Sequence, residues 1–112
     1  MARLAAGILV NALVRRVNAA GGSAMVLAKG DAEAGAILVL AIERGGNPRF
    51  FERGIGPAGE PALVRSGPAE LADDGAVSDY WQRRRSSDSD LWVVELDIAG
   101  AERFAAETLA TG

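Results

Sequence analysis

The sequence predicts an α+β fold, in which helices pack on a mostly antiparallel sheet of four or five strands. Three patterns lead to this prediction. Residues 6–20 repeat apolar side chains at the spacing of one helix face, and residues 101–110 suit a terminal helix. Two apolar runs, 23–29 and 36–43, have the length, the branched side chains and the flanking glycines of strands. Residues 91–98 alternate two sets of side chains, as a strand with two different faces does.

The first helix is expected from residue 6 to residue 20, where two glycines end it. Asn11 and Arg15 lie opposite its apolar arc, and Arg16 lies at the edge of that arc. The segment superficially resembles a signal peptide, but Asn11 interrupts the apolar stretch and the two arginines stand where a small-residue cleavage site should follow. We therefore expect an amphipathic core helix and a cytoplasmic location.

The two apolar runs are expected to be strands joined by a hairpin loop over residues 30–35. In each run both alternating sets of side chains are apolar, which is typical of central strands that are covered on both faces. The loop has a glycine at each end, as tight connections often do. A second turn at 44–48 then leads to a short strand around 49–53.

The second half of the chain begins with a segment rich in glycine, proline and alanine. Residues 54–75 predict a long surface connection in which only 62–65 suit a strand. A short helix is expected at about 76–85, before the last strand. Trp92 heads that strand on its more apolar face, so we expect it to anchor the core. The length predicts a single domain, residues 1–112.

The chain contains no cysteine and no histidine. These absences remove disulfides, thiolate nucleophiles, the commonest general base and the commonest transition-metal ligands. Any catalysis would have to use carboxylates, hydroxyls, arginine, one lysine or one tyrosine. We therefore expect no cofactor, no metal site and no catalytic residue, and the residue set weighs against an enzyme.

The charge of the chain does not favour a nucleic-acid partner. The net charge is −3, so the chain as a whole repels nucleic acid weakly. The arginine run at 83–85 is followed at once by Asp88 and Asp90, which is typical of a solvated charged segment. No apolar run in the sequence approaches the roughly 18 residues that a membrane span requires, so no membrane association is expected.

One surface is expected to carry binding residues, namely Arg15, Arg16, Lys29, Asp31 and Glu33. Paired arginines at a helix edge are more than core packing requires, and arginine holds carboxylate or phosphate groups with a planar fork. A loop bounded by glycines can approach a ligand closely, with Lys29 and Asp31 offering opposite charges. The structural alternative is that Arg15 pairs with Asp31 or Glu33 within one molecule.

Four segments of the sequence together resemble a known family. They are Arg3-Leu4 with Ala12-Leu13-Val14-Arg15-Arg16-Val17, then Lys29-Gly30-Asp31 with Ala34-Gly35-Ala36-Ile37, then Val77-Ser78-Asp79-Tyr80, and last Asp88-Ser89-Asp90-Leu91-Trp92-Val93-Val94-Glu95. In order and spacing they are similar to the mainly alphaproteobacterial domain-of-unknown-function family 1491. The similarity extends over about residues 3–104. The family has no known activity, so the resemblance implies a cytoplasmic bacterial protein and assigns no site.

Three functions are consistent with these patterns. The leading interpretation is a small non-enzymatic binding or protein-interaction module, whose partner is a second copy or another protein. Such a module should show an exposed apolar patch or a two-fold interface. The first alternative is a small enzyme acting on a phosphorylated or otherwise anionic metabolite, which should gather two carboxylates with shifted pKa values in a concave pocket. The second alternative is contact with nucleic acid, which requires the arginines on one continuous face.

Overall fold

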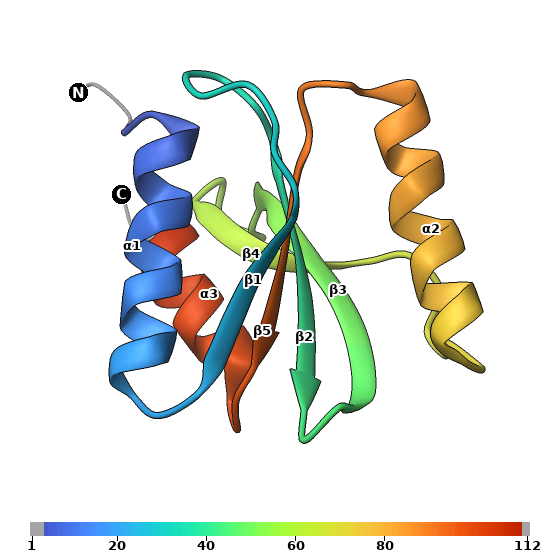
Figure 1. Cartoon of the computed structure of the whole chain (residues 1–112). Coiled ribbons are helices and arrows are strands. Elements are labelled where there is room, and N and C mark those ends of the chain that lie inside the picture. The colour runs from blue at the N-terminus through green and yellow to red at the C-terminus, as the bar shows by residue number, and fades with distance from the viewer. Residues whose placement is uncertain (1–3, 111–112) are drawn as a thin grey trace.

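The computed structural model describes residues 4–110, which form a sheet with helices on both faces (Figure 1). The elements in chain order are α1 (Ala6–Ala19), β1 (Ser23–Ala28), β2 (Ile37–Glu43), β3 (Gly46–Ile55), β4 (Pro61–Ser66), α2 (Asp74–Ser87), β5 (Trp92–Asp97) and α3 (Ala101–Leu109). α1 and α3 cover one face of the sheet, and α2 covers the other. The predicted α+β class and the three predicted helices are confirmed. Arg3, which contributes to the family resemblance, lies outside the described residues.

β5 lies between β1 and β2, because the strand order in the sheet is β1-β5-β2-β3-β4. β5 runs parallel to β2, and the other neighbouring strands pair antiparallel, so the sheet is mixed and mostly antiparallel. The predicted hairpin between β1 and β2 is wrong, since a third strand separates them. β2 is central as predicted, whereas β1 is an edge strand. The loop that joins them, residues 29–36, passes over the start of β5.

The crossing of this loop over β5 leaves no space for a side chain at two positions. A Cβ added to Gly30 would lie 2.1 Å from the carbonyl oxygen of Asp90, and one added to Gly35 would lie 2.2 Å from the same atom. The Asp31 N–H donates a hydrogen bond to this oxygen at 3.0 Å. The glycines at the two ends of the loop therefore mark a close crossing of two chain segments rather than a hairpin turn.

The same loop completes the N-terminus of α1. The first N–H groups of a helix have no partner within the helix, and Ala5 at the N-cap has no side chain that can accept their bonds. The Ala6 N–H donates instead to the carbonyl oxygen of Glu33 at 3.1 Å. The Gly7 N–H donates to the carbonyl oxygen of Ala32 at 2.9 Å. The start of α1 is thus stabilised by backbone from a distant part of the sequence.

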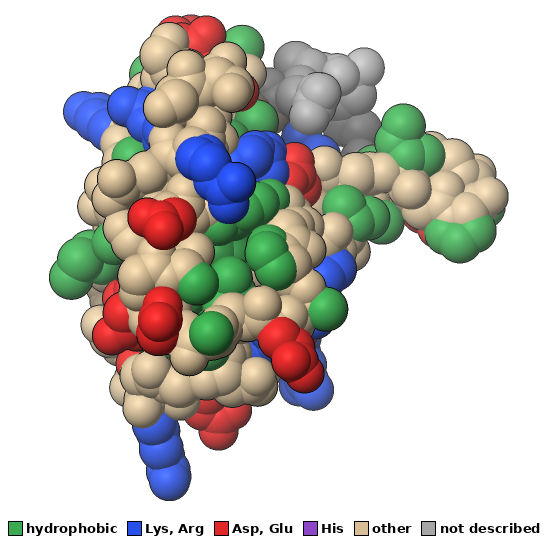
Figure 2. All heavy atoms as spheres, turned by 90° about the vertical axis from the view of Figure 1, so that its right-hand side faces the viewer, with side chains coloured by type: hydrophobic (Ala, Val, Ile, Leu, Met, Phe, Trp, Pro, Cys, Tyr) green, Lys and Arg blue, Asp and Glu red, His purple; other side chains and the backbone are tan. Residues whose placement is uncertain are grey.

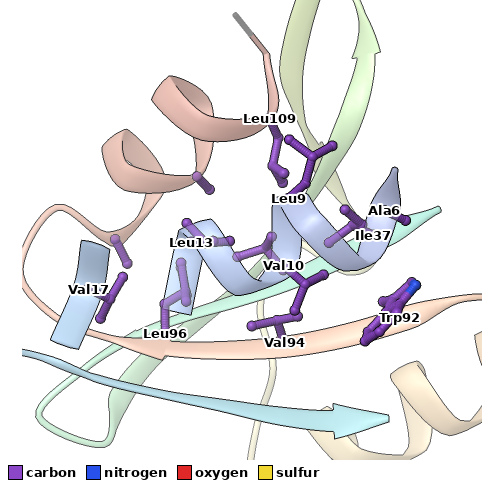
Figure 3. Packing of buried hydrophobic residues seen from close by; sticks show 14 residues of the cluster. Ala6, Leu9, Val10, Leu13, Val17, Ile37, Trp92, Val94, Leu96 and Leu109 are labelled. Atoms are coloured by element: carbon purple, nitrogen blue, oxygen red, sulfur yellow. The ribbon is translucent and has the colours of Figure 1, made fainter. Parts of the chain in front are cut away.

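Trp92 ties β5 to the crossing loop from inside the core. The residue is 5% exposed, and its indole N–H donates to the carbonyl oxygen of Asp31 at 2.7 Å. Its backbone N–H donates to the carbonyl oxygen of Ala36 at 2.8 Å. The ring shares the α1 side of the sheet with Val94 and Leu96 (Figure 3). The prediction that Trp92 anchors the core is confirmed.

Two apolar cores lie on the two faces of the sheet. The larger core lies between the sheet, α1 and α3, and its buried residues are Ala6, Leu9, Val10, Leu13, Val17, Ile37, Val39, Ala41, Trp92, Val94, Leu96, Ala101, Ala105 and Leu109. The smaller core lies under α2 and consists of Leu38, Leu40, Phe50, Val77, Leu91 and Val93. β2 and β5 contribute to both cores, which explains why both alternating sets of β2 side chains are apolar.

The segment predicted as a long surface connection, residues 54–75, instead contains the end of β3, all of β4 and the start of α2. β3 continues to Ile55, and β4 pairs with it antiparallel. The turn between them is closed by a hydrogen bond from the Gly56 N–H to the carbonyl oxygen of Glu60 at 2.7 Å. Glycine and proline conceal this hairpin in the sequence, since proline is tolerated where an edge strand begins. The connection is confined to residues 67–73.

We expect Trp92→Ala to lower the free energy of unfolding by about 3–5 kcal/mol, the usual range for removal of a buried aromatic side chain. Trp92→Phe should cost about 1–3 kcal/mol, because it leaves the carbonyl oxygen of Asp31 without its donor. Urea melts of the two variants provide the measurement. A loss below about 1 kcal/mol for Trp92→Ala would show that this side chain does not anchor the core.

Candidate functional site

Arg16, one of the predicted binding residues, is engaged with α3. Its guanidinium donates to Glu107 Oε1 at 2.5 Å and to Thr108 Oγ1 at 2.6 Å. It also lies over the ring of Phe104, 5.6 Å from the ring centre. The side chains of Arg16 and Glu107 are 41% and 52% exposed, so their ion pair contributes only about 0–1 kcal/mol. The contacts of Arg16 therefore connect α1 to α3. Arg15, its neighbour in α1, is exposed.

The other three predicted residues, Lys29, Asp31 and Glu33, are exposed in the loop that crosses β5. Asp31 has a structural role, because its Oδ2 accepts hydrogen bonds from the N–H groups of Glu33 at 3.2 Å and Ala34 at 2.8 Å. The loop adjoins the N-terminus of α1, whereas the two arginines lie roughly 14 Å further along the helix axis. The structure therefore does not bring the five predicted residues together in one site.

The arginine run at the end of α2 does not form one continuous basic surface. Arg83 Nε donates to the carbonyl oxygen of Asp79, one turn earlier in the helix, at 3.4 Å. Arg84 points to β3 and β4, where it meets Glu52 at 2.7 Å. Arg85 donates to the carbonyl oxygen of Leu91 at 3.0 Å. This separation of the three guanidinium groups argues against nucleic-acid contact through the run.

A polar cluster that sequence reasoning missed joins α2 to the sheet. Arg84 binds the Glu52 carboxylate with two bonds, at 2.7 and 3.2 Å. The same guanidinium donates to Ser66 Oγ at 3.1 Å and to the Tyr80 hydroxyl at 2.9 Å. Tyr80 also packs its ring on Phe50, with the ring centres 4.7 Å apart. No local pattern in the sequence marks the cluster, because its residues come from β3, β4 and α2.

In this cluster Glu52 and Arg84 stabilise each other's charged forms. Hydrogen bonding to Arg84 lowers the pKa of the Glu52 carboxyl, against the opposing effect of burial. Glu52 in turn raises the pKa of the Arg84 guanidinium. Figure 2, which looks onto the α2 side, shows charged side chains of both signs around hydrophobic ones. Because both charged groups stay ionised and bind each other, the cluster holds α2 in place and is poorly suited to acid–base chemistry.

A pocket of about 410 Å³ opens beside the larger core, near the N-terminus of α1. Its lining residues are Leu4, Ala6, Leu9, Glu33, Ala34, Gly35, Ala36, Ile37, Glu52, Arg53 and Leu109. Figure 3 shows Leu9, Ile37 and Leu109 close together at this end of α1. Arg53 Nε donates to the carbonyl oxygen of Leu109 at 2.6 Å. Glu33 and Glu52 both line the pocket. Arg84 binds the Glu52 carboxylate, so this group does not serve as the second acid–base carboxylate that the enzyme alternative requires.

Within residues 4–110, no group of three or more Asp and Glu side chains is placed to hold a metal ion. No helix among the described residues has both the length and the apolar character that crossing a membrane demands.

The outer edge of β1 is a surface to which the contacts within residues 4–110 give no structural role. In the sheet of residues 4–110, β5 pairs with one side of β1 and no strand pairs with the other. Met25 is 56% exposed and Val26 is 41% exposed. Successive strand residues point to opposite faces, so both faces of this edge present an apolar side chain. β1 contains no charged residue and no proline.

The opposite edge of the sheet, β4, carries features that discourage pairing with another strand. β4 begins with Pro61, which cannot donate a backbone hydrogen bond, and Arg65 places a charge within the strand. Proteins commonly use proline and charge in this way to prevent association at sheet edges. The two edges therefore differ, because β4 is protected and β1 is not.

We expect Glu52→Gln to lower the free energy of unfolding by about 1–2 kcal/mol at neutral pH, since Arg84 loses its charged partner. The pKa of Glu52 lies below the usual 4.5 in the folded protein. The stabilisation is therefore present above about pH 4.5 and is lost as the pH falls through the lowered pKa. Urea melts should show the difference from wild type shrinking toward low pH.

The control for this experiment is Glu43→Gln, which alters an exposed carboxylate at the end of β2. It should change the free energy of unfolding by less than about 0.5 kcal/mol. Equal losses for the two variants, or a loss for Glu52→Gln that does not depend on pH, would contradict the role assigned to the ion pair.

The chain is similar in fold and sequence to several solved structures. A crystal structure of a DUF1491 family protein from Caulobacter crescentus CB15 is 35% identical, with a TM-score of 0.77, and the match covers 91% of this chain and 94% of that chain. An NMR structure of a DUF1491 family protein from the same organism is 32% identical, with a TM-score of 0.77, and covers 100% of both chains. The solution structure of protein Atu0922 from A. tumefaciens is 32% identical, with a TM-score of 0.69 and 87% coverage of each chain.

No curated protein matches the chain. The family described as a protein of unknown function (DUF1491) matches residues 4–106. This match confirms the resemblance found in the sequence, and the chain belongs to the DUF1491 family of proteins of unknown function.

Proposed function

We propose that this chain is a non-enzymatic protein-interaction module that accepts an additional β-strand along the outer edge of β1. Strand addition needs a row of backbone N–H and C=O groups that lack partners on one side. The edge of β1 supports this, since within residues 4–110 only β5 pairs with it. In this mode of recognition the main-chain hydrogen bonds supply affinity, and the side chains on the two faces supply specificity.

The side chains of β1 support the same function. Met25 and Val26 lie on opposite faces of the sheet and are both substantially exposed. A strand added beside them would cover part of each side chain, and removal of apolar surface from water contributes about 25 cal/mol per Å². The observation that carries the proposal is the contrast between this uncharged, proline-free edge and the protected edge of β4.

Most of the charged residues selected from the sequence lie outside this surface. Arg16 and Asp31 are engaged in bonds within the chain. Lys29 is exposed and directly follows β1, so it lies at one end of this surface. We place the module in the cytoplasm, because a cysteine-free chain suits a reducing compartment.

The test compares lysine substitutions at two edge positions of similar exposure. Val26→Lys introduces a charge at the open edge, and Val64→Lys, at a position that is 36% exposed in β4, is the matched control. Tagged chains are cross-linked inside cells, and the products are resolved by mass. We expect Val26→Lys to reduce the cross-linked products of the wild type at least about tenfold, since a lone charge in a pairing edge disfavours association.

Both lysine variants should unfold within about 1 kcal/mol of the wild type, because both positions are at the surface. Met25→Lys repeats the experiment from the other face of the strand. If Val26→Lys and Met25→Lys retain the same products as Val64→Lys, the outer edge of β1 is not the interaction surface.

A further inference from the structure

We infer that the strand added to β1 is β1 of a second copy of this chain, paired antiparallel about a two-fold axis beside Met25. This inference rests on the proposed function and names the partner of the same edge. The result is one continuous sheet that extends through two molecules. It buries the open edges of both molecules in a single contact.

The sequence of β1 favours its own copy as the partner. Identical strands that carry charges place like charges near one another, which is destabilising. β1 carries no charge, so pairing with itself meets no such repulsion. A two-fold contact also uses the same surface on both molecules and closes after one partner. The outer edges of the joined sheet are then the two β4 strands, which Pro61 and Arg65 protect from further pairing.

The geometry of antiparallel strands limits the possible registers. Residues directly opposite each other point to the same face of a sheet. A two-fold axis must therefore pass beside one residue that faces its own copy, and near the middle of β1 this residue is Met25 or Val26. The β1–β5 register shifts between Val26 and Ala28. With a centre at Met25 only the two end pairs, Ser23 with Leu27, involve the residue that the β1–β5 register skips, whereas a centre at Val26 brings Leu27 and Ala28 into the inner pairs.

The side chains fit the register that is centred on Met25. Met25 pairs with Glu95, whose chain neighbours Val94 and Leu96 point to α1, so Met25 lies on the α2 face. The two Met25 side chains would meet there, and methionine adapts readily to an irregular apolar contact. On the α1 face each Val26 would lie opposite the smaller Ala24 of the second copy. At the centre of the new pairing both faces are thus apolar, and Ser23 lies opposite Leu27 at its two ends.

The first measurement is the molar mass of the wild-type chain by light scattering across a concentration series. We expect twice the 11.6 kDa of one chain, and Val26→Lys should return the mass to that of a single chain while Val64→Lys should not. A wild type that stays at the mass of one chain up to millimolar concentration overturns the inference. If Val26→Lys then still removes cross-linked products that Val64→Lys retains, the proposed function stands with a different partner.

The second measurement tests the register and uses the absence of cysteine, since each introduced thiol is then unique. Met25→Cys places two Cβ atoms about 4.5–5.5 Å apart across the axis, close to disulfide distance. In the same register two Val26→Cys residues are offset, about 7–8 Å apart. Val64→Cys on β4 is the control for random collision.

Under mild oxidation we expect Met25→Cys to form the disulfide-linked dimer at least about tenfold faster than Val26→Cys or Val64→Cys, because only its thiols face each other across the axis. A faster reaction of Val26→Cys than of Met25→Cys overturns the register centred on Met25. Equal rates for all three variants overturn the pairing of β1 with its copy. Melting curves establish that each variant is folded before oxidation. The molar mass of the wild-type chain tests the dimer without any substitution.

Discussion

The insertion of β5 between β1 and β2 is the constraint on which the rest of the structure depends, because the loop that joins those two strands must cross the start of the third. At the crossing, the carbonyl oxygen of Asp90 lies where side chains at Gly30 and Gly35 would stand. The crossing holds the loop where its carbonyl groups cap α1 and where Asp31 receives the indole N–H of Trp92. The same insertion places β1 at the edge of the sheet, where one side of its backbone is open.

Most of the polar side chains with defined contacts serve the fold. Arg16 connects α1 to α3, and Arg84 connects α2 to β3 and β4. Asp97 accepts hydrogen bonds from the N–H groups of Arg44 at 2.7 Å and Gly45 at 3.1 Å, so it fixes the turn between β2 and β3. Of the five residues that the sequence suggests as binding groups, Arg16 and Asp31 have such contacts. The outer edge of β1, which no strand of residues 4–110 covers, is uncharged and lies along a strand rather than around a pocket.

Local periodicity was enough to predict the helix near residues 6–20 and the strand near 91–98, because side chains at those spacings share one face whatever surrounds them. The hairpin at residues 30–35 was predicted wrongly, since glycines allow a tight turn and a close crossing equally well. What decides between them is Asp90, which lies about 60 residues away in the sequence. The pair of Glu52 and Arg84 was missed for the same reason, because neither residue is unusual until β3 and α2 are placed together.

The position of β5 in the chain also has a consequence for biosynthesis. A ribosome releases β1 about 70 residues before β5, the strand on which β1 must pair, while β2 and β3 follow each other and can pair at once. During that interval β1 has two open edges instead of one, and the glycine-bounded loop has nothing to cross. The sheet is complete only when the last strand enters its middle. Because β1 and β5 are far apart in the sequence, their contacts are non-local and form slowly. A nascent chain that ends before β5 therefore holds an apolar strand that lacks its partner in the native sheet.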